Sequence, residues 1–156
     1  MLNRDILEIY IKISEFWREF KKSKSVSTDD YLTYSFAVDV DELAQLVLKG
    51  KKQATTSLYL FYEIDNEALP QVGAYNIILD SQEQPICITQ TKKVYLCRFD
   101  EVTAAYAKKE GEGDLSLAYW RKAHLDFFQS ECAEIGIEFS PEMLVVCEEF
   151  ECVFLI

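Results

Sequence analysis

The stretch from Lys49 to Ser57 carries the residues of this chain that are best suited to chemistry. It is basic and then hydroxyl-rich, and it contains no acid: Lys49, Gly50, Lys51, Lys52, Gln53, Ala54, Thr55, Thr56, Ser57. In a chain whose formal net charge is −11, such a local reversal of charge is typical of a patch that contacts nucleic acid phosphates. The hydroxyls beside the ammonium groups add candidate nucleophiles.

A glycine-bearing acidic turn, Glu110 to Asp114, is the second candidate region. Its acids Glu112 and Asp114 could coordinate a cation, since carboxylate oxygens are the ligands of Ca²⁺ and Mg²⁺. Two acids without further ligand spacing favour another role, which is to cap the helix that begins near Leu115. We therefore expect no metal here.

Trp120, Arg121 and His124 follow the acidic turn on a predicted helix. Trp120 and His124 are four positions apart, so they share one helical face, which favours packing inside the fold. The functional alternative is that one of these side chains lines a ligand site, with an aromatic ring stacked on a base.

A helix and a strand are expected to hold the basic stretch. Asp39 and Glu42 resemble a capping box, and the helix that they begin ends at Gly50, where a left-handed backbone is favoured. Ala54 to Ile64 is rich in Thr, Tyr and Phe and predicts a strand. The lysines and hydroxyls would thus lie at a helix-to-strand junction.

The remaining pattern predicts an α+β fold. Further strands are expected at Ala74–Leu79, at Pro85–Phe99 with a bend near Lys92 and Lys93, and at Met143–Ile156. Further helices are expected from an Asn3 cap to about Lys22, from an Asp100 cap to Glu110, and from the acidic turn to just before Gly136. About five β segments without a regular βαβ repeat favour α+β, and closing the sheet into a small barrel would protect its edges.

Length and composition indicate one packed domain. The 156 residues are 49% hydrophobic and contain few Gly or Pro, so we expect a single domain over 1–156, with 1–30 as a helix-and-loop extension packed on it. No window approaches the roughly 18 apolar residues of a membrane span. We expect a cytoplasmic protein with no membrane partner, and aromatic residues on the first helix leave a homodimer contact open.

The pattern of the cysteines and the absence of common cofactor and catalytic motifs limit the kinds of site that we expect. The five cysteines form no C-x-x-C pair and lie within apolar patterns, which is typical of buried thiols in a reducing compartment. There is no zinc spacing, phosphate-binding loop, dinucleotide fingerprint or Ser-His-Asp arrangement, so we expect no cofactor. The net negative charge argues against tight binding to long nucleic acid.

Taken in order, the motifs resemble the ASCH domain family. They are Gly50-x-Lys52-x-x-Thr55, Glu110-Gly111-Glu112-Gly113-Asp114, Trp120-Arg121-x-x-His124, and Cys147-Glu148-x-Phe150 near the end. The resemblance implies a PUA-like small β-barrel of about five to six strands with flanking helices, a fold shared with RNA-binding domains. It also implies a cleft beside the barrel, which would recognise a nucleoside or an RNA-derived ligand.

In one small ASCH subfamily, the Lys and Thr of the first motif and a later Glu are assigned to the hydrolysis of N4-acetylcytidine. The matching positions here are Lys52, Thr55 and Glu110. That subfamily commonly has Arg two residues after the Thr, where this chain has Ser57. The resemblance places the remaining candidate ligand-binding residues in the same cleft: Gly50, Lys51, Thr56, Ser57, Asp114, Trp120, Arg121 and His124.

Amide hydrolysis needs a nucleophile, a proton carrier and a donor to the oxyanion. We assign Thr55 as nucleophile or water-orienting group, Glu110 as proton carrier, and Lys52 as the charge facing the oxyanion. There are two alternatives. The cleft binds a ligand without catalysis, or Lys52 and Glu110 form an ion pair that is purely structural. Only one of Thr55 and Thr56 is expected to face the cleft, because adjacent strand residues point to opposite faces.

Two rival functions use other residues. A non-catalytic RNA-binding module would present a basic patch formed by Lys49, Lys51, Lys52, Lys92, Lys93 and Arg98, and its affinity would fall steeply with salt. A protein-interaction domain would instead use the helix from Ile6 to Phe20 and would form a stable oligomer.

Overall fold

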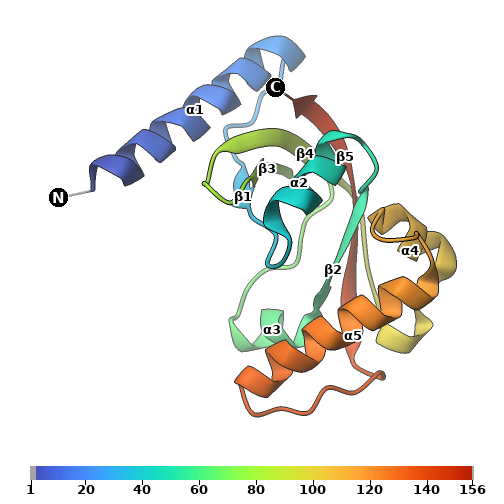
Figure 1. Ribbon diagram of the computed structural model, residues 1–156. Coiled ribbons are helices and arrows are strands. Elements are labelled where there is room, and N and C mark those ends of the chain that lie inside the picture. Colours follow the sequence, from blue (N-terminus) through green and yellow to red (C-terminus); the bar gives the residue numbers. More distant parts are fainter. Residues whose placement is uncertain (1–2, 156) are drawn as a thin grey trace.

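Two long antiparallel strands form the centre of a curled five-stranded sheet, and Figure 1 shows it as a half-barrel. The computed structural model describes residues 3–155. The strands are β1 (Leu32–Tyr34), β2 (Ala54–Leu58), β3 (Tyr75–Leu79), β4 (Pro85–Arg98) and β5 (Leu144–Leu155), in the spatial order β1-β3-β4-β5-β2. Only β1 and β3 pair in parallel. The predicted α+β, PUA-like architecture is confirmed.

The sheet curls where β4 departs from regular pairing with β5. The register shifts between Thr91 and Lys93, which is the position of the predicted bend. An extra residue in one strand of an antiparallel pair bends that strand and increases its twist. The two ends of the sheet, β1 and β2, therefore remain as free edges of a half-closed barrel.

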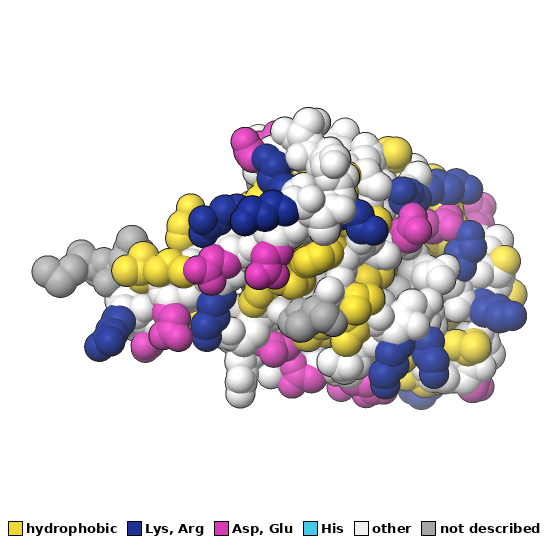
Figure 2. All heavy atoms as spheres, turned by 90° about the horizontal axis from the view of Figure 1, so that it is seen from above, with side chains coloured by type: hydrophobic (Ala, Val, Ile, Leu, Met, Phe, Trp, Pro, Cys, Tyr) yellow, Lys and Arg dark blue, Asp and Glu magenta, His cyan; other side chains and the backbone are white. Residues whose placement is uncertain are grey.

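Helix α1 (Arg4–Lys24) begins at the predicted Asn3 cap, whose side chain accepts a hydrogen bond from the Asp5 amide. Its C-terminal half packs on β3 and β4 through Ile13, Phe16, Trp17 and Phe20. Its N-terminal half extends past the sheet (Figure 1), and Figure 2 shows apolar side chains near its projecting end between charged ones. Those exposed apolar residues are Ile6, Leu7, Tyr10 and Ile11.

Helix α2 (Val40–Leu48) leads into the basic stretch, and the predicted capping box does not form. Asp39 has a left-handed backbone (φ 46°) and its side chain makes no cap hydrogen bond, because the cap requires an extended residue at this position. Gly50 has the expected left-handed backbone (φ 72°). The helix packs against β3, β4 and β5 through Leu43, Ala44 and Val47.

The strand predicted for Ala54–Ile64 is correct only in its first half. After Leu58 the chain turns directly into α3 (Tyr59–Ile64). Leu58 and Phe61 are three residues apart, and both contact the core formed by β2, β5, α4 and α5. This helical spacing packs one side of the segment against the core, which overrides the strand preference of its Tyr and Phe residues.

The helix that ends at Glu110 starts later than predicted. Phe99–Glu101 is a short 3₁₀ segment, η1, and the cap of α4 (Ala104–Glu110) is Thr103, whose hydroxyl accepts from the Tyr106 amide. Helix α5 (Leu117–Glu134) is capped by Ser116. No helix within residues 3–155 is long and apolar enough to cross a membrane.

Candidate functional site

A small pocket lies where the two free edges of the curled sheet come together. The residues after β1 form one wall, β2 forms the opposite wall, and the end of α4 with the middle of α5 closes the base. The cavity has a volume of about 90 Å³, which holds a few waters or the edge of a flat ring. Its lining residues are Tyr34, Phe36, Ala37, Val38, Leu43, Lys52, Thr55, Thr56, Glu110, Glu112, Ala123, His124 and Phe127.

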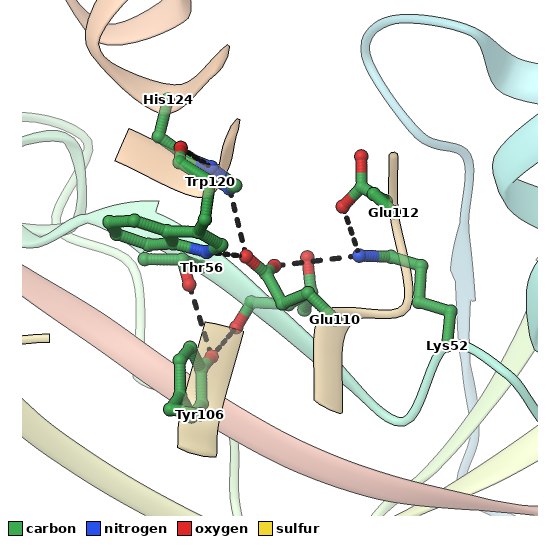
Figure 3. Close-up of polar contacts among 8 residues, drawn as sticks. Lys52, Thr56, Tyr106, Glu110, Glu112, Trp120 and His124 are labelled. Atoms are coloured by element: carbon green, nitrogen blue, oxygen red, sulfur yellow. Dashed lines mark hydrogen bonds and ion pairs between the residues drawn. The ribbon is translucent and has the colours of Figure 1, made fainter. Parts of the chain in front are cut away.

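Lys52 is buried at the bottom of this pocket, with only 1% of its side chain exposed. Its Nζ lies 2.9 Å from Glu112 Oε2 and 3.4 Å from Glu110 Oε1, as Figure 3 shows. It also lies 5.4 Å from the centre of the Phe36 ring. A buried ammonium is tolerated only when it is paired, so the acidic turn serves as the counter-charge of Lys52.

Glu110 is equally buried and is bound from three directions. Trp120 Nε1 donates to Oε2, His124 Nε2 lies 3.0 Å from the same oxygen, and Lys52 approaches the other oxygen. Burial alone would raise the pKa of Glu110, but the charge of Lys52 and the hydrogen bonds from His124 and Trp120 lower it below its ordinary value. Glu110 is therefore ionised at neutral pH and is a weak proton acceptor.

His124 completes this network as a double donor. Its Nδ1 lies 2.9 Å from the Trp120 carbonyl oxygen, which can only accept, and its Nε2 faces the ionised Glu110. Both ring nitrogens therefore carry hydrogen, which is the cationic form. Burial alone would lower the pKa of His124, but the hydrogen bond and charge of Glu110 raise it above its ordinary value.

The raised pKa of His124 makes the stability of the protein depend on pH. A group whose pKa is higher in the folded state stabilises below its unfolded value of about 6.5 and loses that contribution as the pH rises through the folded value. We expect the free energy of unfolding to fall above pH 6.5, by up to about 1.4 kcal/mol for each unit by which the pKa is raised.

Urea unfolding from pH 6 to pH 9 measures this slope, and His124→Gln is the matched control because it keeps one side-chain donor but cannot titrate. The slope above pH 6.5 should flatten in His124→Gln. An identical slope in the two proteins would show that other groups whose pKa rises on folding, such as Cys147, whose pKa burial raises to about 12, cause the dependence.

Both Thr55 and Thr56 line the pocket, so the expectation that only one of them would face the cleft is wrong. The Thr56 hydroxyl is already used: it donates to the Tyr106 hydroxyl at 3.0 Å, which donates to the Thr55 carbonyl oxygen at 2.7 Å. The Thr55 hydroxyl has the Tyr34 phenol as its neighbour. Desolvation raises the pKa of that phenol to about 12, with Thr55 lowering it in part, although Tyr34 as a residue is 41% exposed.

Five of the sequence-predicted residues meet in the pocket, and the others lie outside it. Those in the pocket are Lys52, Thr55, Thr56, Glu110 and His124. Trp120 lies behind Glu110, stacked between Phe99 and His124. Arg121 donates to the carbonyls of Phe99, Asp100 and Val102, Asp114 accepts from the Ser116 amide, Ser57 bonds Tyr62, and Gly50 is exposed.

Sequence reasoning did not select Glu112, Tyr34 or Phe36 as ligand-binding residues. Glu112 was recognisable as an acid two positions from Glu110, but its contact with Lys52 depends on the path of the turn. That path is set by Gly111, whose φ of 72° brings the turn against the Lys51 carbonyl. In the sequence, Tyr34 and Phe36 could be recognised only as aromatic residues. Their position in the pocket depends on the curl of the sheet, which brings β1 opposite β2.

Glu110, Glu112 and His124 present ligand atoms within 4.8 Å of one another, which is a spacing that a metal ion could use. The Lys52 ammonium already contacts both carboxylates. The negative charge of the cluster is therefore balanced by a side chain of the chain itself.

Comparisons with known proteins show which family the chain resembles. The model of the ASCH domain matches residues 32–154. The ASCH domain structure from Lactobacillus crispatus JV V101 is 36% identical, with 90% of this chain and 92% of that chain covered and a TM-score of 0.83. A protein structure from Enterococcus faecalis V583 is 35% identical, with coverage of 94% and 90% and a TM-score of 0.85.

A more distant likeness concerns the fold alone. The ASCH protein of Zymomonas mobilis is 12% identical, with 78% of this chain and 66% of that chain covered and a TM-score of 0.50. The comparison with curated proteins gave no match.

Proposed function

Because the chain belongs to the ASCH family, we propose that its pocket binds a nucleobase or nucleoside and hydrolyses an N4-acylated cytidine amide through Lys52, Thr55 and Glu110. The observation that carries the proposal is the buried Lys52 ammonium at the base of a small pocket that also contains the Thr55 hydroxyl. A positive charge held away from water interacts strongly with the negative charge that develops on an amide oxygen.

Lys52 has a donor left for the substrate. An ammonium has three N–H donors, and two are directed at Glu110 and Glu112. The third is suited to the carbonyl oxygen of an amide. The Glu112 side chain is 22% exposed. Its ion pair with Lys52 can therefore rearrange when a ligand enters the pocket.

In the proposed reaction, Glu110 is not the proton carrier that the sequence favoured. Its lowered pKa and its three donors make it a poor proton carrier. In the proposed reaction Glu110 keeps the Lys52 ammonium charged and in position. Thr55 remains the nucleophile, since the Thr56 hydroxyl is engaged by Tyr106.

The walls of the pocket suit a flat heterocycle. Phe36 and Phe127 supply aromatic surface, and Val38 and Leu43 supply apolar surface, above the charged floor. Apolar walls with a few fixed polar groups are the usual composition of a small-molecule site. Base stacking on an aromatic side chain is worth about 1–3 kcal/mol.

Turnover of N4-acetylcytidine, measured as cytidine released, tests the proposal. We expect Lys52→Ala and Thr55→Ala to reduce kcat/KM by about 100-fold or more, as for loss of an oxyanion donor or a nucleophile. Lys51→Ala is the matched control, because Lys51 is the exposed neighbour of Lys52. Turnover that survives in both variants, or that falls equally in the control, would overturn the assignment.

The alternative function, RNA binding without catalysis, is favoured by one feature. A groove of about 780 Å³ on the other side of Gly111 is lined by Lys51, Lys108 and Lys109. Lys109 is paired with Glu149, however, and on the face seen in Figure 2 Lys and Arg side chains alternate with Asp and Glu. An affinity for single-stranded RNA that falls steeply with salt would support this alternative.

A further inference from the structure

Glu148 lies across the sheet from Thr55 and on the same side. The two are direct partners in the antiparallel pairing of β2 with β5. Directly opposed residues point to the same face, with Cβ atoms about 4.5–5.5 Å apart. At this spacing the Glu148 side chain can approach the Thr55 hydroxyl, and the Tyr34 phenol is influenced by both residues. The next acid, Glu149, is opposed to Ala54, points to the other face and pairs with Lys109.

One of the two oxygens of the Glu148 carboxylate accepts a hydrogen bond. Thr91 Oγ1 donates to Oε2 at 2.9 Å, and Thr91 is itself contacted by Asn76 Nδ2 at 3.5 Å. Within residues 3–155, no hydrogen bond to Oε1 is present and no cation forms a salt bridge with Glu148. The titratable groups that face Glu148 are the phenols of Tyr34 on β1 and Tyr62 on α3, both of which feel its charge.

The pKa values of Glu148 and Glu110 are shifted in opposite directions. Burial raises the pKa of Glu148, and the Thr91 hydrogen bond offsets this only in part, whereas the pKa of Glu110 is lowered. A group that must both accept and return a proton works best when its pKa approaches the working pH. Two carboxylates with opposite shifts thus divide the roles of charge holder and proton carrier.

On the basis of the proposed function, we infer that Glu148 is the general base and acid that activates Thr55. Glu148 takes the hydroxyl proton as Thr55 Oγ1 bonds to the amide carbon, and the carbonyl electron pair moves to an oxyanion facing Lys52. When the oxyanion collapses, the bond from carbon to N4 breaks and Glu148 gives its proton to N4, which releases cytidine and leaves an ester on Thr55.

Water completes the cycle through the same groups. Glu148 takes a proton from the water as its oxygen attacks the ester carbon. The bond to Thr55 Oγ1 breaks, and Oγ1 receives the proton from Glu148. The acyl group leaves as a carboxylic acid, and both side chains return to their starting state.

Glu148→Gln and Glu149→Gln form a matched pair of variants, since adjacent acids on opposite faces of one strand are each replaced by an amide of equal size. The experiment measures kcat/KM for N4-acetylcytidine from pH 5 to pH 9, together with the dissociation constant of cytidine. We expect Glu148→Gln to lower kcat/KM by 100-fold or more and to abolish the acidic limb of the profile. Cytidine binding should change less than threefold, and Glu149→Gln should behave like the wild type.

The outcomes separate this inference from the proposed function. If the wild type turns over N4-acetylcytidine and Glu148→Gln keeps both its rate and its acidic limb, Glu148 is not the proton carrier and the proposed function stands. If Glu148→Gln loses cytidine binding in proportion to its rate, Glu148 acts in binding and the inference is wrong. If the wild type gives no turnover, the proposed hydrolysis and this inference both fall.

Discussion

Replacing Glu110 with alanine is expected to lower the free energy of unfolding by about 3–5 kcal/mol, the usual effect of removing one partner from a buried ion pair. The substitution leaves the Lys52 ammonium with only the part-exposed Glu112, and it leaves the Trp120 indole without its acceptor. Urea denaturation at pH 7 measures the loss.

Two further variants show whether the loss comes from the unpaired charge. Glu112→Ala removes the part-exposed partner and should cost only about 1 kcal/mol, because Glu110 still pairs with Lys52 and water screens part of the lost pair. Adding Lys52→Met to Glu110→Ala should restore part of the stability, because the buried Lys52 ammonium is then no longer left without Glu110 as its partner. Equal losses for Glu110→Ala and Glu112→Ala would contradict the burial of this pair as the cause.

Gly111→Ala is expected to cost about 2–5 kcal/mol of stability and to abolish activity. A Cβ at this position would lie 2.2 Å from the Lys51 carbonyl oxygen, and the backbone has a φ of 72°. A left-handed conformation costs a non-glycine residue about 1–2 kcal/mol, and the forced separation costs about 1–3 kcal/mol more. Since Lys51 precedes Lys52, the displacement would move the ammonium out of the site.

Gly136→Ala separates the two contributions. Gly136 has nearly the same backbone angle, φ 73°, but a Cβ there would meet nothing within 4 Å. It should therefore cost only about 1–2 kcal/mol and leave activity intact. Thermal unfolding and the N4-acetylcytidine assay on both variants provide the comparison, and similar behaviour of the two would contradict the close approach of the turn to Lys51.

Local sequence patterns predicted the elements around the site better than the contacts within it. The ends of α2 and α5 follow from Gly50 and Gly136, and the bend of β4 coincides with Lys92 and Lys93. The error at Tyr59–Ile64 arose because strand and helix preferences overlap for short apolar segments. There, the partly buried Phe61 packs against the same core as Leu58, which is three residues away and fits a helix.

The chemical roles of the site residues could not be predicted from local sequence patterns, because they depend on distances between residues that are far apart in the chain. Trp120 and His124 were expected to pack or to line a ligand site. Their contacts with the Glu110 carboxylate depend on how α4 and α5 pack against each other, which no local pattern specifies. Likewise, the pairing of Thr55 with Glu148 depends on the register of two strands that are far apart in the chain. A shift of one residue would have placed Glu149 beside Thr55 instead.

Binding of the substrate in the pocket is tested most directly by a crystal structure of the Thr55→Ala protein soaked with N4-acetylcytidine, which this variant should bind but not hydrolyse. We expect the N4 edge of the cytosine ring to enter the pocket between Phe36 and Phe127, with the acetyl oxygen about 2.7–2.9 Å from Lys52 Nζ. A ligand bound in the groove of Lys51 and Lys108, or a pocket that stays empty at millimolar ligand, would contradict it.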